Sequence, residues 1–247
     1  MFLPQEAEDA EGTLTDEGTV VYENKDASAA IGVQPLQETV AGMNFESVRT
    51  TICIADADAA KEYDFQFDLE EGQKLMTAAD YLGEEYDTGE VYVVNNNGEI
   101  QYVIDPAWAK DANGDDVETH YEVSENTLTQ VTNFDENTAF PVVADPTAWQ
   151  VTKCAGAISW AVGSTIFSVA KLAKVKKYIK AIGGVKKSAK KYMAAIKAAK
   201  KQAKKEGSRN WRKYLKRKNI ASQFGSSLLG FASVVSGVDQ IIKKCDF

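Results

Sequence analysis

Charge is divided unevenly along this chain of 247 residues, and the division limits how the chain can fold. Residues 1–150 contain 33 acidic and 5 basic residues, a formal charge of −28. Residues 151–247 contain 23 basic and 3 acidic residues, a formal charge of +20. Each half repels itself electrostatically, whereas the two halves attract each other. The sequence therefore predicts two regions with different physical roles, an acidic one followed by a basic one.

Residues 19–146 have the pattern of an acidic domain built from short strands, because β-branched and aromatic runs recur between turn signals. One run places four apolar side chains on a single face: Tyr63, Phe65, Phe67 and Leu69. Asn97-Gly98 predicts a hairpin, since both residues tolerate a positive φ. The expected strands lie at residues 19–22, 29–36, 47–54, 62–69, 90–95, 99–105, 119–124, 126–134 and 139–143. We expect an antiparallel β-sandwich or a strongly twisted antiparallel sheet.

Two other segments of this half are predicted to lack regular structure. Residues 1–18 are acidic and contain few apolar side chains, so we expect a flexible leader. Residues 147–153, where the charge changes sign, are the expected linker to the basic half. Asp145, Pro146 and Thr147 form the expected processing region, because a residue before proline is extended and proteases cut exposed linkers.

Residues 154–247 predict a cationic domain, an antiparallel bundle of four or five helices. The uncharged segment 154–170 is short for a bilayer span, so we expect a buried helix, with membrane insertion as the alternative. Gly183-Gly184 separates two lysine-rich helices. The second has one apolar stripe with spacings of 4, 3, 4, 3 and 4 residues and Met193 beside it: Val185, Ala189, Tyr192, Ile196, Ala199 and Ala203.

A lysine-rich helix with a narrow apolar stripe is typical of segments that lie in the interface of an anionic membrane. Aromatic side chains among basic ones also suit the headgroup region. The basic region almost lacks the glutamates that pair with lysines on ordinary solvated helices, although a solvated face remains the alternative. The expected membrane-binding residues are Trp160, Lys176, Lys177, Lys186, Lys187, Lys190, Lys191, Trp211, Arg212, Lys213, Tyr214, Lys216 and Arg217.

Three cysteines bear on the cellular compartment. Cys154 and Cys245 bracket the basic region, and we expect them to form a disulfide worth about 4–5 kcal/mol, with two free thiols as the alternative. Cys53 is expected to be a buried thiol in a strand. Because disulfides persist in oxidising compartments, we expect an exported protein, although residues 1–18 lack the composition of a secretory signal.

No catalytic or metal-binding set is recognisable in the sequence. His120 is the only histidine and no CxxC pair occurs, so we expect neither a metal site nor another cofactor. The acidic cluster Asp111–Asp116 is typical of a turn, and no phosphate-binding glycine motif is present. We therefore expect a protein that is not an enzyme.

Several stretches resemble a poorly characterised family. DPAWAKDANGDDVETHYEVSENTLTQV at 105–131 and FPVVADPTAW at 140–149 resemble a domain of secreted actinobacterial proteins, in which PVVADP ends an extracellular module. CAGAISW, AKVKKYIKAIGGVKKSAKK and the last cysteine are similar to small cationic helical tails attached to that domain. The layout also resembles, more loosely, bacteriocin precursors that release a cationic fragment. This resemblance implies secretion and carries no catalytic residues.

The sequence thus leads to one functional hypothesis, one alternative and a third possibility, a purely structural exported protein with a receptor on the target cell. The first is a secreted antimicrobial protein, bacteriocin- or toxin-like, whose basic tail binds and perturbs anionic bacterial membranes. Its acidic domain would be a carrier or an inhibitory pro-domain that pairs with the tail until a protease activates it. The alternative is a non-lytic binder of an anionic cell-wall polymer or, less favoured, of nucleic acid.

Overall fold

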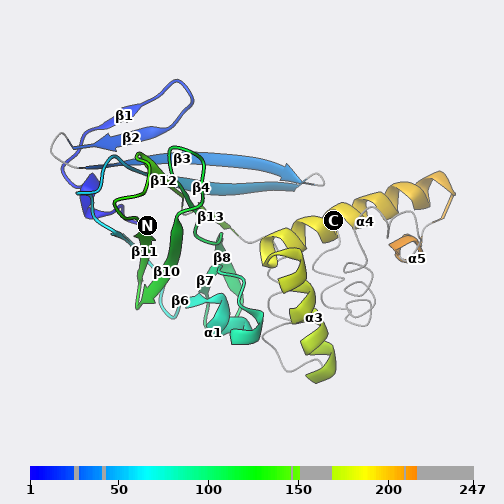
Figure 1. Ribbon diagram of the computed structural model, residues 1–247. Helices are drawn as coiled ribbons and strands as arrows, with labels where there is room; N and C mark the ends of the chain where they lie inside the picture. The colour runs from blue at the N-terminus through cyan, green and yellow to red at the C-terminus, as the bar shows by residue number, and fades with distance from the viewer. Residues whose placement is uncertain (25–27, 41–42, 146, 151–168, 209, 216–247) are drawn as a thin grey trace.

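The computed structural model describes residues 1–24, 28–40, 43–145, 147–150, 169–208 and 210–215 (Figure 1). Its strands are β1 (Gly12–Leu14), β2 (Val20–Glu23), β3 (Ala29–Val40), β4 (Met43–Ile54), β5 (Glu62–Gln66), β6 (Lys74–Thr77), β7 (Val91–Val94), β8 (Ile100–Ile104), β9 (Ala109–Lys110), β10 (Glu118–Ser124), β11 (Thr127–Asn133), β12 (Val142–Ala144) and β13 (Thr147–Gln150). Its helices are α1 (Ala78–Leu82), α3 (Val169–Ile182), α4 (Val185–Lys205) and α5 (Arg212–Leu215). The chain contains both strands and helices with antiparallel sheets, as the sequence predicts for an α+β protein.

Two antiparallel sheets enclose the first hydrophobic core. Ten strands form a broad sheet: eight follow the order β1-β2-β3-β4-β13-β8-β7-β6, β12 also pairs with β4, and β9 pairs with β12. The smaller sheet has the order β10-β11-β5. Ile31 and Ile52 of the broad sheet are buried with Tyr63, Phe65 and Leu128 of the smaller one. The alternating pattern of residues 62–66 therefore directs its apolar face inward, as predicted.

A second core lies on the other face of the broad sheet. All four residues of β7 are buried, and they alternate between the two cores. Val91 and Val93 belong to the core between the sheets, whereas Tyr92 packs in a cluster with Ile179 of α3 and Ile196 of α4. The described helices therefore share a core with the sheet. The helical bundle that the sequence predicts is not confirmed, and residues 151–168 and 216–247 lie outside the described residues.

The hairpin expected at Asn97-Gly98 is confirmed. β7 and β8 pair antiparallel, and Gly98 has a φ of 75° in the turn between them. The Gly98 N–H donates a hydrogen bond to the Asn95 carbonyl at 2.9 Å. A positive φ is accessible to glycine without steric cost, so the turn needs this residue type.

The expected linker begins with a strand of the sheet. Residues 147–150 form β13, which pairs with β4 on one side and with β8 on the other. Asp145, in the expected processing region, is 4% exposed. Proline and the change of charge sign suggested a linker, but neither reports on the long-range pairing that places this segment inside the sheet.

The expected flexible leader is also ordered in part. Gln5–Ala7 form a 3-10 turn, and β1 pairs with β2. The Phe2 N–H donates a hydrogen bond to the Gln66 carbonyl at 2.6 Å, and Ala7 is buried. Backbone pairing with the neighbouring β2 and with Gln66 of the distant β5 thus orders a segment whose own composition is too polar to form a core.

Candidate anion-binding surface

The basic segment meets the sheets at the start of α4. Gly183 and Gly184 have φ values of 89° and 103°, and they separate α3 from α4 as the sequence predicts. A Cβ atom on Gly184 would lie 2.1 Å from a carboxylate oxygen of Glu90. Glycine is therefore needed at position 184 both for its backbone conformation and for the close approach of this carboxylate.

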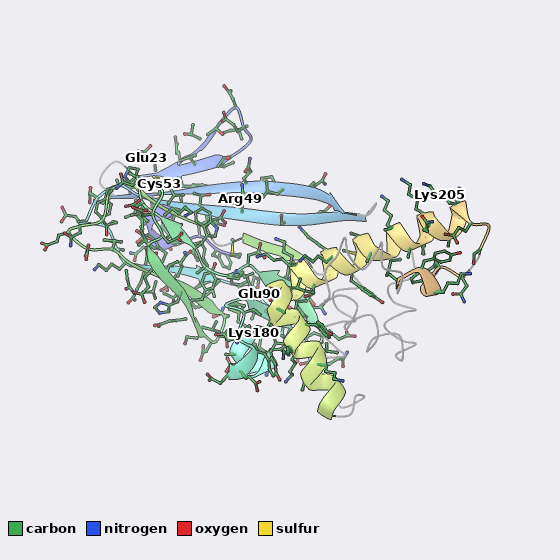
Figure 2. All side chains as sticks on the ribbon, turned by 45° about the vertical axis from the view of Figure 1, so that its right-hand side comes forward. Glu23, Arg49, Cys53, Glu90, Lys180 and Lys205 are labelled. Atoms are coloured by element: carbon green, nitrogen blue, oxygen red, sulfur yellow. The ribbon has the colours of Figure 1, made fainter. Side chains whose placement is uncertain are left out.

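Glu90 is a buried carboxylate, 1% exposed, that joins the acidic half to the basic half (Figure 2). Its Oε2 atom accepts hydrogen bonds from the Tyr92 hydroxyl at 2.7 Å, the Val185 N–H at 3.0 Å and the Thr88 hydroxyl at 3.1 Å. The Val185 N–H lies at the first turn of α4, where helices leave N–H groups unpaired and favour negative charge. Burial raises the pKa of Glu90, although the three hydrogen bonds oppose this effect.

Three lysines make further contacts across this junction. Lys186 Nζ forms an ion pair with Asp105 Oδ2 at 2.5 Å. Lys180 Nζ donates a hydrogen bond to the Glu85 carbonyl at 2.6 Å, and Lys176 Nζ lies 5.6 Å from the centroid of the Tyr86 ring. Of the expected membrane-binding lysines, Lys176 and Lys186 therefore contact the acidic half in this structure.

The apolar stripe of α4 is buried along its length. The stripe contains the six predicted positions and Met193, all at most 3% exposed. It packs against α3, against α5 and against side chains of the broad sheet that include Tyr92 and Val103. The face expected to rest on a membrane is therefore inside the protein in this conformation.

The opposite side of α4 is an exposed lysine face. We define it by six lysines with exposed side chains: Lys187, Lys191, Lys197, Lys201, Lys204 and Lys205. The sequence of α4 contains no acidic residue. At 1.5 Å per residue the face extends over about 27 Å. The face follows α4, which runs from the junction near Glu90 away from the sheets towards Lys205 (Figure 2).

Two of the expected membrane-binding aromatic residues, Trp211 and Tyr214, lie near the end of α4 and take part in its hydrophobic core. Tyr214 is 1% exposed, and its hydroxyl donates a hydrogen bond to Glu206 Oε2 at 3.1 Å. Trp211 is half-buried, with Lys200 Nζ 5.4 Å from its ring centroid. The spacing of Trp211 and Tyr214 among basic residues suggested membrane contact. In the structure, the Tyr214 ring is part of the hydrophobic core at the end of α4.

The other expected contacts are partly outside the described residues. Lys177 and Lys213 have exposed side chains, and Lys190 is half-buried. Arg212 lies in α5, and its side chain is not among those described. The expected sites that the structure does not describe are Trp160, Lys216, Arg217, Pro146, Cys154 and Cys245.

Within the described part of the chain, no group of three or more His, Cys, Asp or Glu side chains could hold a metal ion. His120 is exposed and lies 3.5 Å from Glu122. Cys53 lies in β4 as predicted but is only half-buried, and burial raises the pKa of its thiol.

Among the residues that the structure describes, every helix is too short or too polar to cross a bilayer. No protein-family model, curated protein or solved structure matches this sequence.

Proposed function

We propose that this chain is a secreted antimicrobial protein, bacteriocin- or toxin-like, that binds anionic bacterial membranes through its basic helical segment. The observation that carries the proposal is the two-sided character of α4, with exposed lysines on one side and a buried apolar stripe on the other. The lysine face would meet anionic lipid headgroups first. Release of α4 from the sheet would then present the apolar stripe to the bilayer, so the acidic half serves as an inhibitory pro-domain.

A second candidate follows from the burial of the apolar stripe. While α4 stays docked, only its charged face is available, and such a surface binds anions without inserting into lipid. The protein would then be a non-lytic binder of an anionic wall polymer. Salt weakens both kinds of binding by screening, so salt dependence alone does not separate them.

The experiment compares the full chain on vesicles rich in phosphatidylglycerol and on vesicles of phosphatidylcholine, with vesicle binding and dye release measured together. We expect binding and release only with the anionic vesicles. Binding without release would favour the non-lytic candidate, and no binding at low salt would contradict the membrane proposal.

The lysine face is tested with a double variant, Lys191→Gln with Lys201→Gln. Each lysine near an anionic surface contributes about 1 kcal/mol, so we expect vesicle binding to weaken by about 30-fold. The matched control is Lys74→Gln with Lys110→Gln, two exposed lysines of the acidic half. Equal losses in the two double variants would show that net charge matters and the lysine face does not.

A further inference from the structure

A groove of about 750 Å³ lies between the broad sheet and the first turn of α4. It is lined by β4, by the chain after β8, by Asp145 and by the start of α4. Its volume is within the range of about 300–1,000 Å³ that is common for small-molecule sites. The groove is separate from most of the lysine face, which continues along α4 to Lys205.

One wall of the groove carries an exposed tryptophan. The Trp108 side chain is 41% exposed, although large aromatic residues usually bury most of their surface. The backbone around it is fixed, because the Trp108 carbonyl accepts hydrogen bonds from the Asp145 N–H at 3.3 Å and from Gln130 Nε2 at 3.4 Å. The backbone that carries this exposed ring is therefore anchored at the groove, where the ring can stack on the apolar face of a ligand ring.

Three cations and two carboxylates line the same groove. Asp145 pairs with Arg49 Nε at 3.0 Å and Asp105 pairs with Lys186, whereas Lys187 has no acidic partner among the described residues. These five side chains together carry a formal charge of +1. The Arg49 side chain is 46% exposed, and its single described ion pair is through Nε, so its terminal nitrogens can donate to a ligand. A planar guanidinium held in this way suits a planar carboxylate.

We propose that this groove binds a carboxylate-bearing sugar unit of a glycan. The sugar ring stacks on Trp108, and its carboxylate lies between Arg49 and Lys187. The net charge of +1 matches the single charge of a carboxylate better than the double charge of a phosphate monoester. This site is independent of the proposed membrane binding, because it needs neither the far part of the lysine face nor the release of α4.

The probe is trigalacturonate, with its trimethyl ester as the uncharged analogue, titrated calorimetrically into the full chain at about 0.15 M salt to screen the lysine face. We expect saturable binding of the acid and at least about tenfold weaker binding of the ester, which loses its ionic partners. Glucose 1-phosphate is the competing probe. Equal binding of acid and ester, or tighter binding of the phosphate, would overturn the assignment.

Two exposed lysines of α4 provide a matched pair of variants. Lys187→Gln removes a charge from the groove, and Lys204→Gln removes the same charge from the far end of the helix. We expect the first to weaken trigalacturonate binding severalfold and the second to leave it unchanged. Equal effects would indicate diffuse attraction between polyions and would overturn the proposal.

The tryptophan is tested with Trp108→Ala and Trp108→Phe. We expect the alanine variant to bind trigalacturonate at least about tenfold more weakly and the phenylalanine variant to retain part of the affinity, since it keeps a ring. Unchanged binding by a folded alanine variant would remove the stacking role. A chain that binds trigalacturonate but ignores anionic vesicles would support the groove and contradict the proposed membrane function.

Discussion

The Glu90 carboxylate accepts a hydrogen bond from the Val185 backbone N–H at 3.0 Å, although the two residues are 95 positions apart in the sequence. This contact links the acidic sheet directly to the first turn of the basic helix α4. It is buried, so water cannot replace either partner when the other is lost. This carboxylate therefore contributes to the position of α4 on the sheet, together with the shared hydrophobic core.

The first prediction concerns Glu90→Ala. The substitution leaves the Val185 N–H and the Tyr92 hydroxyl buried without their acceptor, at a cost of about 1–3 kcal/mol for each group. We expect the free energy of unfolding, measured in urea, to fall by at least about 1–3 kcal/mol. Glu84→Ala removes an exposed carboxylate from the same loop and is the control, with an expected change within about 0.5 kcal/mol. Similar losses in both variants would mean that Glu90 does not hold the helix.

The second prediction concerns Gly184→Ala. The new Cβ would meet the Glu90 carboxylate at 2.1 Å, and the backbone at position 184 has a φ of 103°. We expect this variant to lose more stability than Gly207→Ala, which has a φ of 65° and open space around the added atom. Backbone strain alone costs about 1–3 kcal/mol, so the difference between the variants measures the close approach. Equal melting temperatures would contradict the observed packing.

The third prediction concerns pH. Burial raises the pKa of Glu90, with the charge of Asp105 adding to the effect, so the folded state binds the proton more tightly than the unfolded state does. The resulting stability is present below the ordinary glutamate pKa of 4.5 and is lost as pH rises through the raised pKa. Relative to Glu90→Gln, the natural chain should therefore lose free energy of unfolding as pH rises above the ordinary glutamate pKa of 4.5. A constant difference between the two chains would show that the pKa of Glu90 is not raised.

The fourth prediction concerns the apolar stripe of α4. Ile196 is 2% exposed, and Ile196→Ala removes methylene groups from the core that α4 shares with α3 and the sheet. We expect the free energy of unfolding to fall by about 2–4 kcal/mol. Lys197→Ala, on the next residue and on the exposed side, should change it by no more than about 0.5 kcal/mol. If Ile196→Ala is as mild as Lys197→Ala, the stripe is not buried in solution.

Local patterns in the sequence predicted much of the secondary structure. The alternation at Tyr63 and Phe65, the Asn97-Gly98 hairpin and the helix break at Gly183-Gly184 all depend on nearest neighbours, and all are observed. The apolar stripe of α4 was equally readable from spacing. These features are visible in the sequence because side-chain periodicity and glycine conformation are properties of short segments.

Other features depend on contacts between distant segments. Residues 147–150 became a strand because β4 and β8 lie on either side of them, and Tyr214 became core because it packs at the end of α4. The groove beside Trp108 was missed because its residues come from separate parts of the chain. An exposed tryptophan cannot be told from a buried one by its sequence neighbours.

The sequence by itself determined the charge of each half, the period of each segment and the two-sided character of α4. Only the tertiary structure decided where the apolar side of α4 is directed, and it placed that side against the sheet through the buried Glu90 contact. The physical reason is that periodicity defines an apolar face without identifying its partner. The partner is fixed by hydrogen bonds and packing between residues that the sequence keeps far apart.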